Sequence, residues 1–155
     1  MLEELINDAD FAKVIKSNMQ DLIVYLFEKN MHFGILCNVD DVSFAPELPE
    51  EIRSQLHNMT LFYLAAYTFE SAKIEDSCLM FEAGFGAENF GSVVSVPLLS
   101  IVQIIVDEQP IFINLSKYKE KQEDKELKKE IDEKGVENSM NIFLSNPENS
   151  KFIKK

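Results

Sequence analysis

The sequence predicts an α+β fold that is mostly β: an N-terminal helix, a small and strongly bent β-sheet forming a barrel or sandwich, and a charged C-terminal tail. Three observations support this prediction. Apolar residues recur at helical spacing within the first 30 residues. Short apolar runs separated by Gly, Pro, Asn and Asp follow up to residue 114. Charged residues dominate from residue 117. We therefore expect a folded domain at 1–116 and a tail at 117–155.

Residues 2–30 are predicted to form the helix. Four apolar residues follow the i, i+3, i+4, i+7 spacing of an amphipathic helix: Met19, Leu22, Ile23 and Leu26. Asp8 or Asp10 is suited to cap its N-terminus, and Asn30 lies where a helix C-terminus often falls. Two aromatic residues widen the apolar face. A homodimer through this helix is one expectation, and plain core packing in a monomer is the other.

The strands are expected at 32–38, 42–45, 60–69, 78–85, 93–96 and 111–114. Turns are expected at 40–41 and 73–77, and a loop at 46–51 leads to a turn of helix near 52–56. The run 60–69 is apolar on both faces, which predicts a strand covered on both sides or lying in a closed barrel. Residues 98–106 are almost fully apolar, and the pattern does not separate a short buried helix from a strand.

A glycine-rich turn joins two of these strands. It holds Gly84, Gly86 and Gly91, three of the five glycines of the chain, and Pro97 ends the strand that follows. One interpretation is a hairpin with a bulge, in which glycine supplies a positive φ. The other is that the missing side chains let a peptide backbone come close to the sheet.

Charge is unevenly distributed along the chain, whose formal net charge is −12. Residues 1–116 hold 5 Lys and Arg against 18 Asp and Glu, whereas residues 117–155 hold 10 against 9. An acidic folded part disfavours nucleic acid and anionic membranes as partners. No apolar run reaches the roughly 18 residues of a transmembrane helix, and the acidic N-terminus lacks the basic start of a signal peptide. We therefore expect a cytoplasmic protein.

Little in the sequence predicts catalysis. Cys37 and Cys78 lie in apolar runs and are expected to be buried, reduced thiols. Their spacing from His57 does not suit a zinc site, so no metal or cofactor is expected. His32 and His57 lie outside any nucleophile motif. Glu82 flanks the glycine turn, and a hydrolase using Glu82 or His57 is the least favoured interpretation.

Two motifs carry a resemblance to a known family. Residues 81–86 read Phe-Glu-Ala-Gly-Phe-Gly, and residues 94–98 read Val-Ser-Val-Pro-Leu. Together with a helix that ends at Asn30 and a strand that begins at His32, these two motifs resemble the SspB (stringent starvation protein B) family. The similar span covers residues 19–114. Members are adaptors that deliver ssrA-tagged substrates to the ClpXP protease. The turn departs from the family pattern at Ala87, which stands where the family has a second glycine.

The resemblance implies an Sm-like barrel or sandwich after the helix, with a groove that binds the peptide tag. The groove positions carried over lie on two strands: Tyr63 and Ala65 on one, and Glu82, Ala83, Gly84, Phe85 and Gly86 on the other. The family's tail ends in a peptide that docks on the unfoldase ClpX. The matching terminal residues are Lys151, Phe152, Ile153, Lys154 and Lys155.

The expected function is therefore a non-enzymatic, peptide-binding adaptor for ClpXP. Because ssrA tags usually carry acidic residues and the folded part is acidic, like charges favour a different peptide as the ligand. The alternative is an acidic cytoplasmic chaperone of the secretion or flagellar-export kind, which binds an extended segment of one client.

Overall fold

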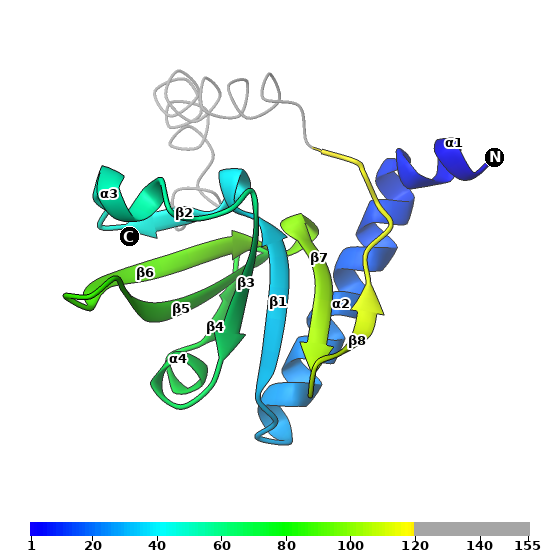
Figure 1. Ribbon diagram of the computed structural model, residues 1–155. Helices are drawn as coiled ribbons and strands as arrows, with labels where there is room; N and C mark the ends of the chain where they lie inside the picture. Colours follow the sequence, from blue (N-terminus) through cyan, green and yellow to red (C-terminus); the bar gives the residue numbers. More distant parts are fainter. Residues whose placement is uncertain (120–155) are drawn as a thin grey trace, which may run out of the picture. The chain divides into compact units, whose positions relative to one another are not determined.

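The computed structural model describes residues 1–119. It contains two antiparallel sheets of four strands each, preceded by helices (Figure 1). The first sheet has the strand order β3-β1-β7-β8, and the second has the order β2-β6-β5-β4. This arrangement confirms the α+β prediction, although the sheets do not close into a barrel. Almost all of the predicted tail, including the expected ClpX-docking residues, lies outside the described residues, so the boundary at 116 stays a prediction.

The described part of the chain has the following elements. The first sheet comprises β1 (Phe33–Asn38), β3 (Met59–Leu64), β7 (Ile101–Val106) and β8 (Gln109–Ile113). The second comprises β2 (Ser43–Ala45), β4 (Lys73–Glu75), β5 (Cys78–Phe85) and β6 (Phe90–Pro97). The helices are α1 (Leu2–Ile6), α2 (Ala9–Glu28), α3 (Glu50–Arg53) and α4 (Tyr67–Glu70), with 3-10 turns η1 (Val39–Asp41) and η2 (Leu98–Ser100).

The predicted N-terminal helix is two helices, and the break between them is caused by a cap. Asp8 has an extended backbone, with φ −80° and ψ 133°, and its carboxylate accepts a hydrogen bond of 2.9 Å from the N–H of Phe11. This satisfies one of the N–H groups that lack a partner at a helix start. At the other end, Asn30 takes φ 54° and turns the chain toward β1.

We expect Asp8→Ala to lower the free energy of unfolding by about 1 kcal/mol, because it removes the N-terminal cap of α2. Urea denaturation of the variant measures this loss. Asp10→Ala is the matched control, since Asp10 is exposed and its nearest cation, Lys13, lies 4.0 Å away. Exposed pairs of this kind contribute less. Equal losses in the two variants would contradict the capping role.

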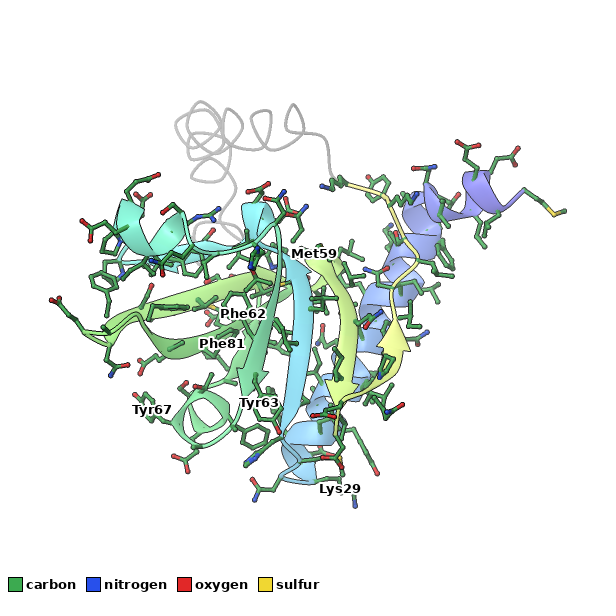
Figure 2. The ribbon with its side chains drawn as sticks, in the orientation of Figure 1. Lys29, Met59, Phe62, Tyr63, Tyr67 and Phe81 are labelled. Atoms are coloured by element: carbon green, nitrogen blue, oxygen red, sulfur yellow. The ribbon has the colours of Figure 1, made fainter. Side chains whose placement is uncertain are left out.

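The core lies between the two sheets and is closed on one side by α2. Met19, Ile23 and Leu26 are buried on one face of α2, as the helical spacing predicts. They pack in one cluster with the inner faces of both sheets, including Phe62 of β3 and Phe81 of β5 (Figure 2). This cluster packs against the inner face of the second sheet. The outer face of the same sheet is therefore free to form a site.

The prediction of a strand at 60–69 that is covered on both faces is wrong in two respects: the strand is shorter, and one of its faces is exposed. β3 ends at Leu64, Ala66 takes φ 52°, and α4 follows at once. Leu61 and Tyr63 point away from the core and are exposed. The run is apolar because β3, whose outward face is apolar, is followed directly by a short helix. Periodicity alone does not distinguish this arrangement from one strand that is buried on both faces.

The glycine turn forms a hairpin without a bulge. The β5–β6 pairing is continuous from Cys78↔Pro97 to Phe85↔Phe90, so the bulge interpretation is wrong. Positive φ is needed at the turn itself, at Gly86 (φ 74°) and Asn89 (φ 53°).

Two other stretches differ from the expected elements. Residues 73–75, predicted as part of a turn, form β4, and the turn is confined to residues 76–77, which both have positive φ. Residues 98–106 contain both of the predicted options, η2 and then β7. Pro110 lies in β8, an edge strand, where a missing N–H is tolerated.

Candidate functional site

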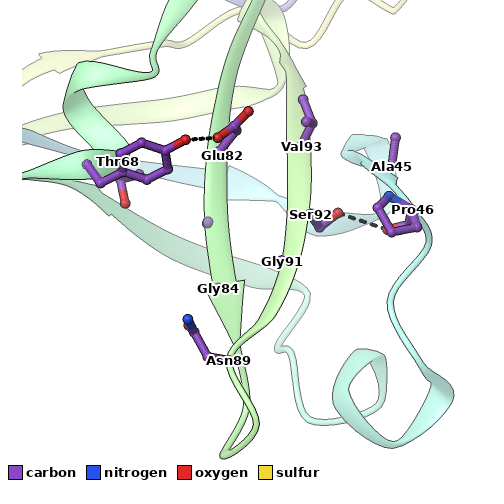
Figure 3. A pocket seen from close by; sticks show the side chains of 11 residues that line it. Ala45, Pro46, Thr68, Glu82, Gly84, Asn89, Gly91, Ser92 and Val93 are labelled. Carbon is purple, nitrogen blue, oxygen red and sulfur yellow. Dashed lines mark hydrogen bonds between the residues drawn. The ribbon is translucent and has the colours of Figure 1, made fainter.

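An open groove of about 510 Å³ lies on the β5–β6 hairpin, and we call it the hairpin groove (Figure 3). Its floor comes from residues 82–84 of β5 and 91–93 of β6. Tyr67 and Thr68 of α4 form one wall, together with Asn89 of the hairpin turn. Ala45 and Pro46, at the end of β2, form the opposite wall. Four separate segments of the chain therefore build the groove.

Two glycines face each other in the floor. Gly84 and Gly91 are paired in register across β5 and β6. A Cβ atom added at Gly91 would meet no atom within 4 Å, so this side of the floor is open. A Cβ atom added at Gly84 would collide with the side chain of Asn89, which lies over it. An extended backbone can therefore approach the floor closely at Gly91, while Asn89 covers the floor at Gly84.

Glu82 is the single charged side chain among the residues that line the groove. Its Oε2 accepts a hydrogen bond from the Tyr67 hydroxyl (Figure 3). This bond to the carboxylate raises the pKa of Tyr67. Glu82 is exposed to solvent, as strand alternation predicts, so its carboxylate retains acceptor positions for a ligand.

The edge of β5 beside the groove is only partly covered. β4 pairs with β5 from Cys78 to Met80, and the N–H of Glu82 donates to Ser71 Oγ at 2.9 Å. Backbone groups in a strand point alternately to its two neighbours. The N–H and C=O of Gly84 therefore point the same way as the N–H of Glu82, away from β6. Within residues 1–119, no strand pairs with β5 at this position.

The structure brings together only part of the site predicted from the sequence. Glu82, Ala83 and Gly84 line the groove. Phe85 turns inward, where its ring lies 5.7 Å from that of Phe44, and Gly86 belongs to the turn.

Tyr63 and Ala65 do not line the hairpin groove. Tyr63 lies on β3 of the other sheet and lines a separate hollow with Leu61, Asp107 and Glu108. These two positions were carried over as neighbours of the glycine strand, but β3 pairs with β1 and not with β5.

Sequence reasoning missed the walls of the groove. The turn of α4 that presents Tyr67 and Thr68 is hidden inside an apolar run, and the positive φ of Ala66 before it has no sequence signal. Pro46 reaches the groove because Ser92 Oγ donates to its carbonyl at 2.9 Å, a contact across 46 positions. Asn89 is the one wall residue with a local signal, since Asn is favoured where φ is positive.

Other reactive residues do not join the groove. Burial, with a smaller contribution from Asp41, raises the pKa of the Cys37 thiol to about 12, which confirms the expected buried thiol. Cys78 is only half-buried. The ring of His32 packs against Phe69 at 5.1 Å, as expected for a structural histidine. No helix within residues 1–119 is long and apolar enough to cross a membrane.

Comparison with known proteins leaves the chain without an assigned family. No family model matches it, and no curated protein matches it. Its function must therefore be argued from the geometry of the hairpin groove and from the motifs in the sequence.

Proposed function

We propose that the chain is a non-enzymatic adaptor of the SspB kind. It binds an extended peptide in the hairpin groove and delivers the protein that carries this peptide to ClpXP. The observation that carries the proposal is the edge of β5 at Gly84, which no strand within residues 1–119 pairs, beside a groove floor that is open at Gly91. An extended peptide adds to a sheet through such an edge, with backbone hydrogen bonds for affinity and flanking pockets for specificity.

The side chains around the groove support binding rather than catalysis. Glu82 is exposed and engaged by Tyr67, and the other lining residues are small, apolar or neutral polar. The groove offers hydrogen-bonding walls and an open strand edge.

The architecture is compatible with the Sm-like fold that the resemblance implies. A helical N-terminus precedes two small antiparallel sheets, and the Phe-Gly hairpin carries the groove. In the proposed adaptor, residues 151–155 dock on ClpX. Two linked weak contacts suffice for delivery, because the link between them raises the effective concentration of the second contact to roughly the millimolar range.

The charge of the groove specifies the peptide. Glu82 is its single charged lining residue, and residues 1–116 hold 18 acidic against 5 basic side chains. A Lys or Arg in the peptide can pair with the Glu82 carboxylate while the Tyr67 bond persists. An acidic residue at the same place meets a like charge. The ligand is therefore a neutral or basic extended peptide, rather than an acidic ssrA-type tag.

A fluorescence-anisotropy titration of two labelled nine-residue peptides, identical except for a central Lys or Glu, tests this proposal. We expect the Lys peptide to bind about five- to tenfold more tightly at low salt, in line with a partly exposed charge pair. Glu82→Gln should remove most of this preference while keeping the backbone contacts. Failure of both peptides to saturate would refute peptide binding, whereas equal affinities would refute only the charge selection.

Delivery is tested separately, by pull-down of ClpX with the full chain and with a chain lacking residues 151–155. The adaptor proposal requires capture by the full chain and loss of capture on deletion. A chain that binds peptide but captures no ClpX would support the chaperone alternative.

A further inference from the structure

The first sheet exposes an apolar outer face that the proposed function does not use. Two cross-strand rows of side chains run over its four strands, as the strand register shows. One row is Leu61, Leu36, Gln103 and Ile113, and the other is Tyr63, Gly34, Ile105 and Pro110. Met59 extends the face along β3 (Figure 2). We call these residues the outer apolar face.

Large side chains on this face are left in contact with water. Tyr63 is 58% exposed, Leu61 55% and Ile113 53%. With the neighbouring Met59 and Ile111, they present on the order of 500 Å² of mostly apolar surface, as large as the largest patches on typical monomers. Leu61 and Tyr63 lie across Gly34, where an added Cβ would approach Leu61 Cδ1 to 3.1 Å. The face is therefore continuous over β1.

Charge distinguishes this face from the rest of the folded part. Neither row contains a charged residue, although residues 1–116 hold 18 acidic side chains. Asp107 and Glu108 lie at one margin, in the turn between β7 and β8. Two copies that meet through most other surfaces bring like charges together, whereas this face brings together apolar groups.

We propose that the outer apolar face binds the same face of a second copy, forming a twofold homodimer. Gln103 lies within the first row, and its amide has both a donor and an acceptor, so two copies of it can pair across a twofold axis. Two such faces bury on the order of 1,000 Å², at the lower limit for a specific interface. The dimer is therefore concentration-dependent, and it differs from a dimer through the N-terminal helix.

Sedimentation velocity of the full chain, from about 1 to about 200 µM, tests this dimer, because interfaces of modest quality have dissociation constants in the micromolar range. Leu61→Lys places a charge within the face, on the edge strand β3, and should raise the dimer dissociation constant at least tenfold. Val14→Lys on α2 is the matched control, because Val14 is also 55% exposed and lies outside the face. It should leave the dimer unchanged. Added salt should tighten the wild-type dimer by screening the repulsion between two acidic chains.

Three results would overturn the proposal. The first is a wild-type chain that stays monomeric up to about 200 µM, well above the micromolar dissociation constants of weak interfaces. The second is a dimer that survives Leu61→Lys. The third is a dimer lost in Val14→Lys, which would place the interface on the N-terminal helix. A thermal melt of each variant distinguishes loss of the interface from loss of the fold, and Ile113→Lys repeats the test at the other edge strand.

Discussion

Gly91→Trp should abolish peptide binding to the hairpin groove and leave the fold intact. Gly91 lies in the floor, an added Cβ meets no atom within 4 Å, and its φ is not in the left-handed region. A side chain at this position therefore starts from a Cβ that meets no neighbouring atom and extends into the groove, and tryptophan is favoured in strands. It fills the open part of the floor, beside the β5 edge to which the peptide is proposed to add. We expect the peptide dissociation constant to rise at least 100-fold, measured by anisotropy.

Ser95→Trp is the matched control for this variant. Ser95 lies on the same strand and the same face of β6, and it is outside the groove lining. Binding within about threefold of wild type is expected, because Ser95 lies outside the lining and substitutions away from a site usually change free energies by about 0.5 kcal/mol or less. Gly86 is a poorer position for a blocking side chain, because its φ of 74° strains any other residue. Undiminished binding by Gly91→Trp would place the peptide site elsewhere.

The hairpin could be predicted because its signals are local. The β5 strand was predicted with its observed bounds, and Pro97 ends β6 as expected. An alternating apolar pattern and a glycine turn belong to a window of about ten residues, where periodicity is informative. The same applies to α2, whose buried residues follow the helical spacing.

The groove could not be predicted in full because its walls are non-local. Register within the second sheet places β2 beside β6, and a single hydrogen bond from Ser92 fixes Pro46 at the rim. Tyr67 reaches Glu82 only because the chain turns at Ala66. Which strands are neighbours is also non-local, so the sequence does not show that Tyr63 lies outside the hairpin groove, on a strand that pairs with β1.

Phe81→Ala should lower the free energy of unfolding by about 3–5 kcal/mol, the largest stability change that we expect for a single side chain here. Phe81 is 1% exposed, and its ring packs edge to face against Phe62 with centroids 5.7 Å apart. The truncation leaves a cavity where β3 of one sheet meets β5 of the other. Because small domains are stable by only about 5–15 kcal/mol, such a loss threatens the whole fold.

Phe81→Ala should affect peptide binding in a different way from Gly91→Trp. Phe81 precedes Glu82 and lies behind the groove, so Phe81→Ala should weaken binding only to the extent that it unfolds the protein. Urea denaturation at 25 °C measures the loss, and Phe81→Leu, which keeps most of the volume, should cost less than about 1.5 kcal/mol. A loss below 1 kcal/mol for Phe81→Ala would mean that the two sheets do not pack through this ring. The hairpin would then need another support, because its floor has no side chains at Gly84 and Gly91 to hold it from outside.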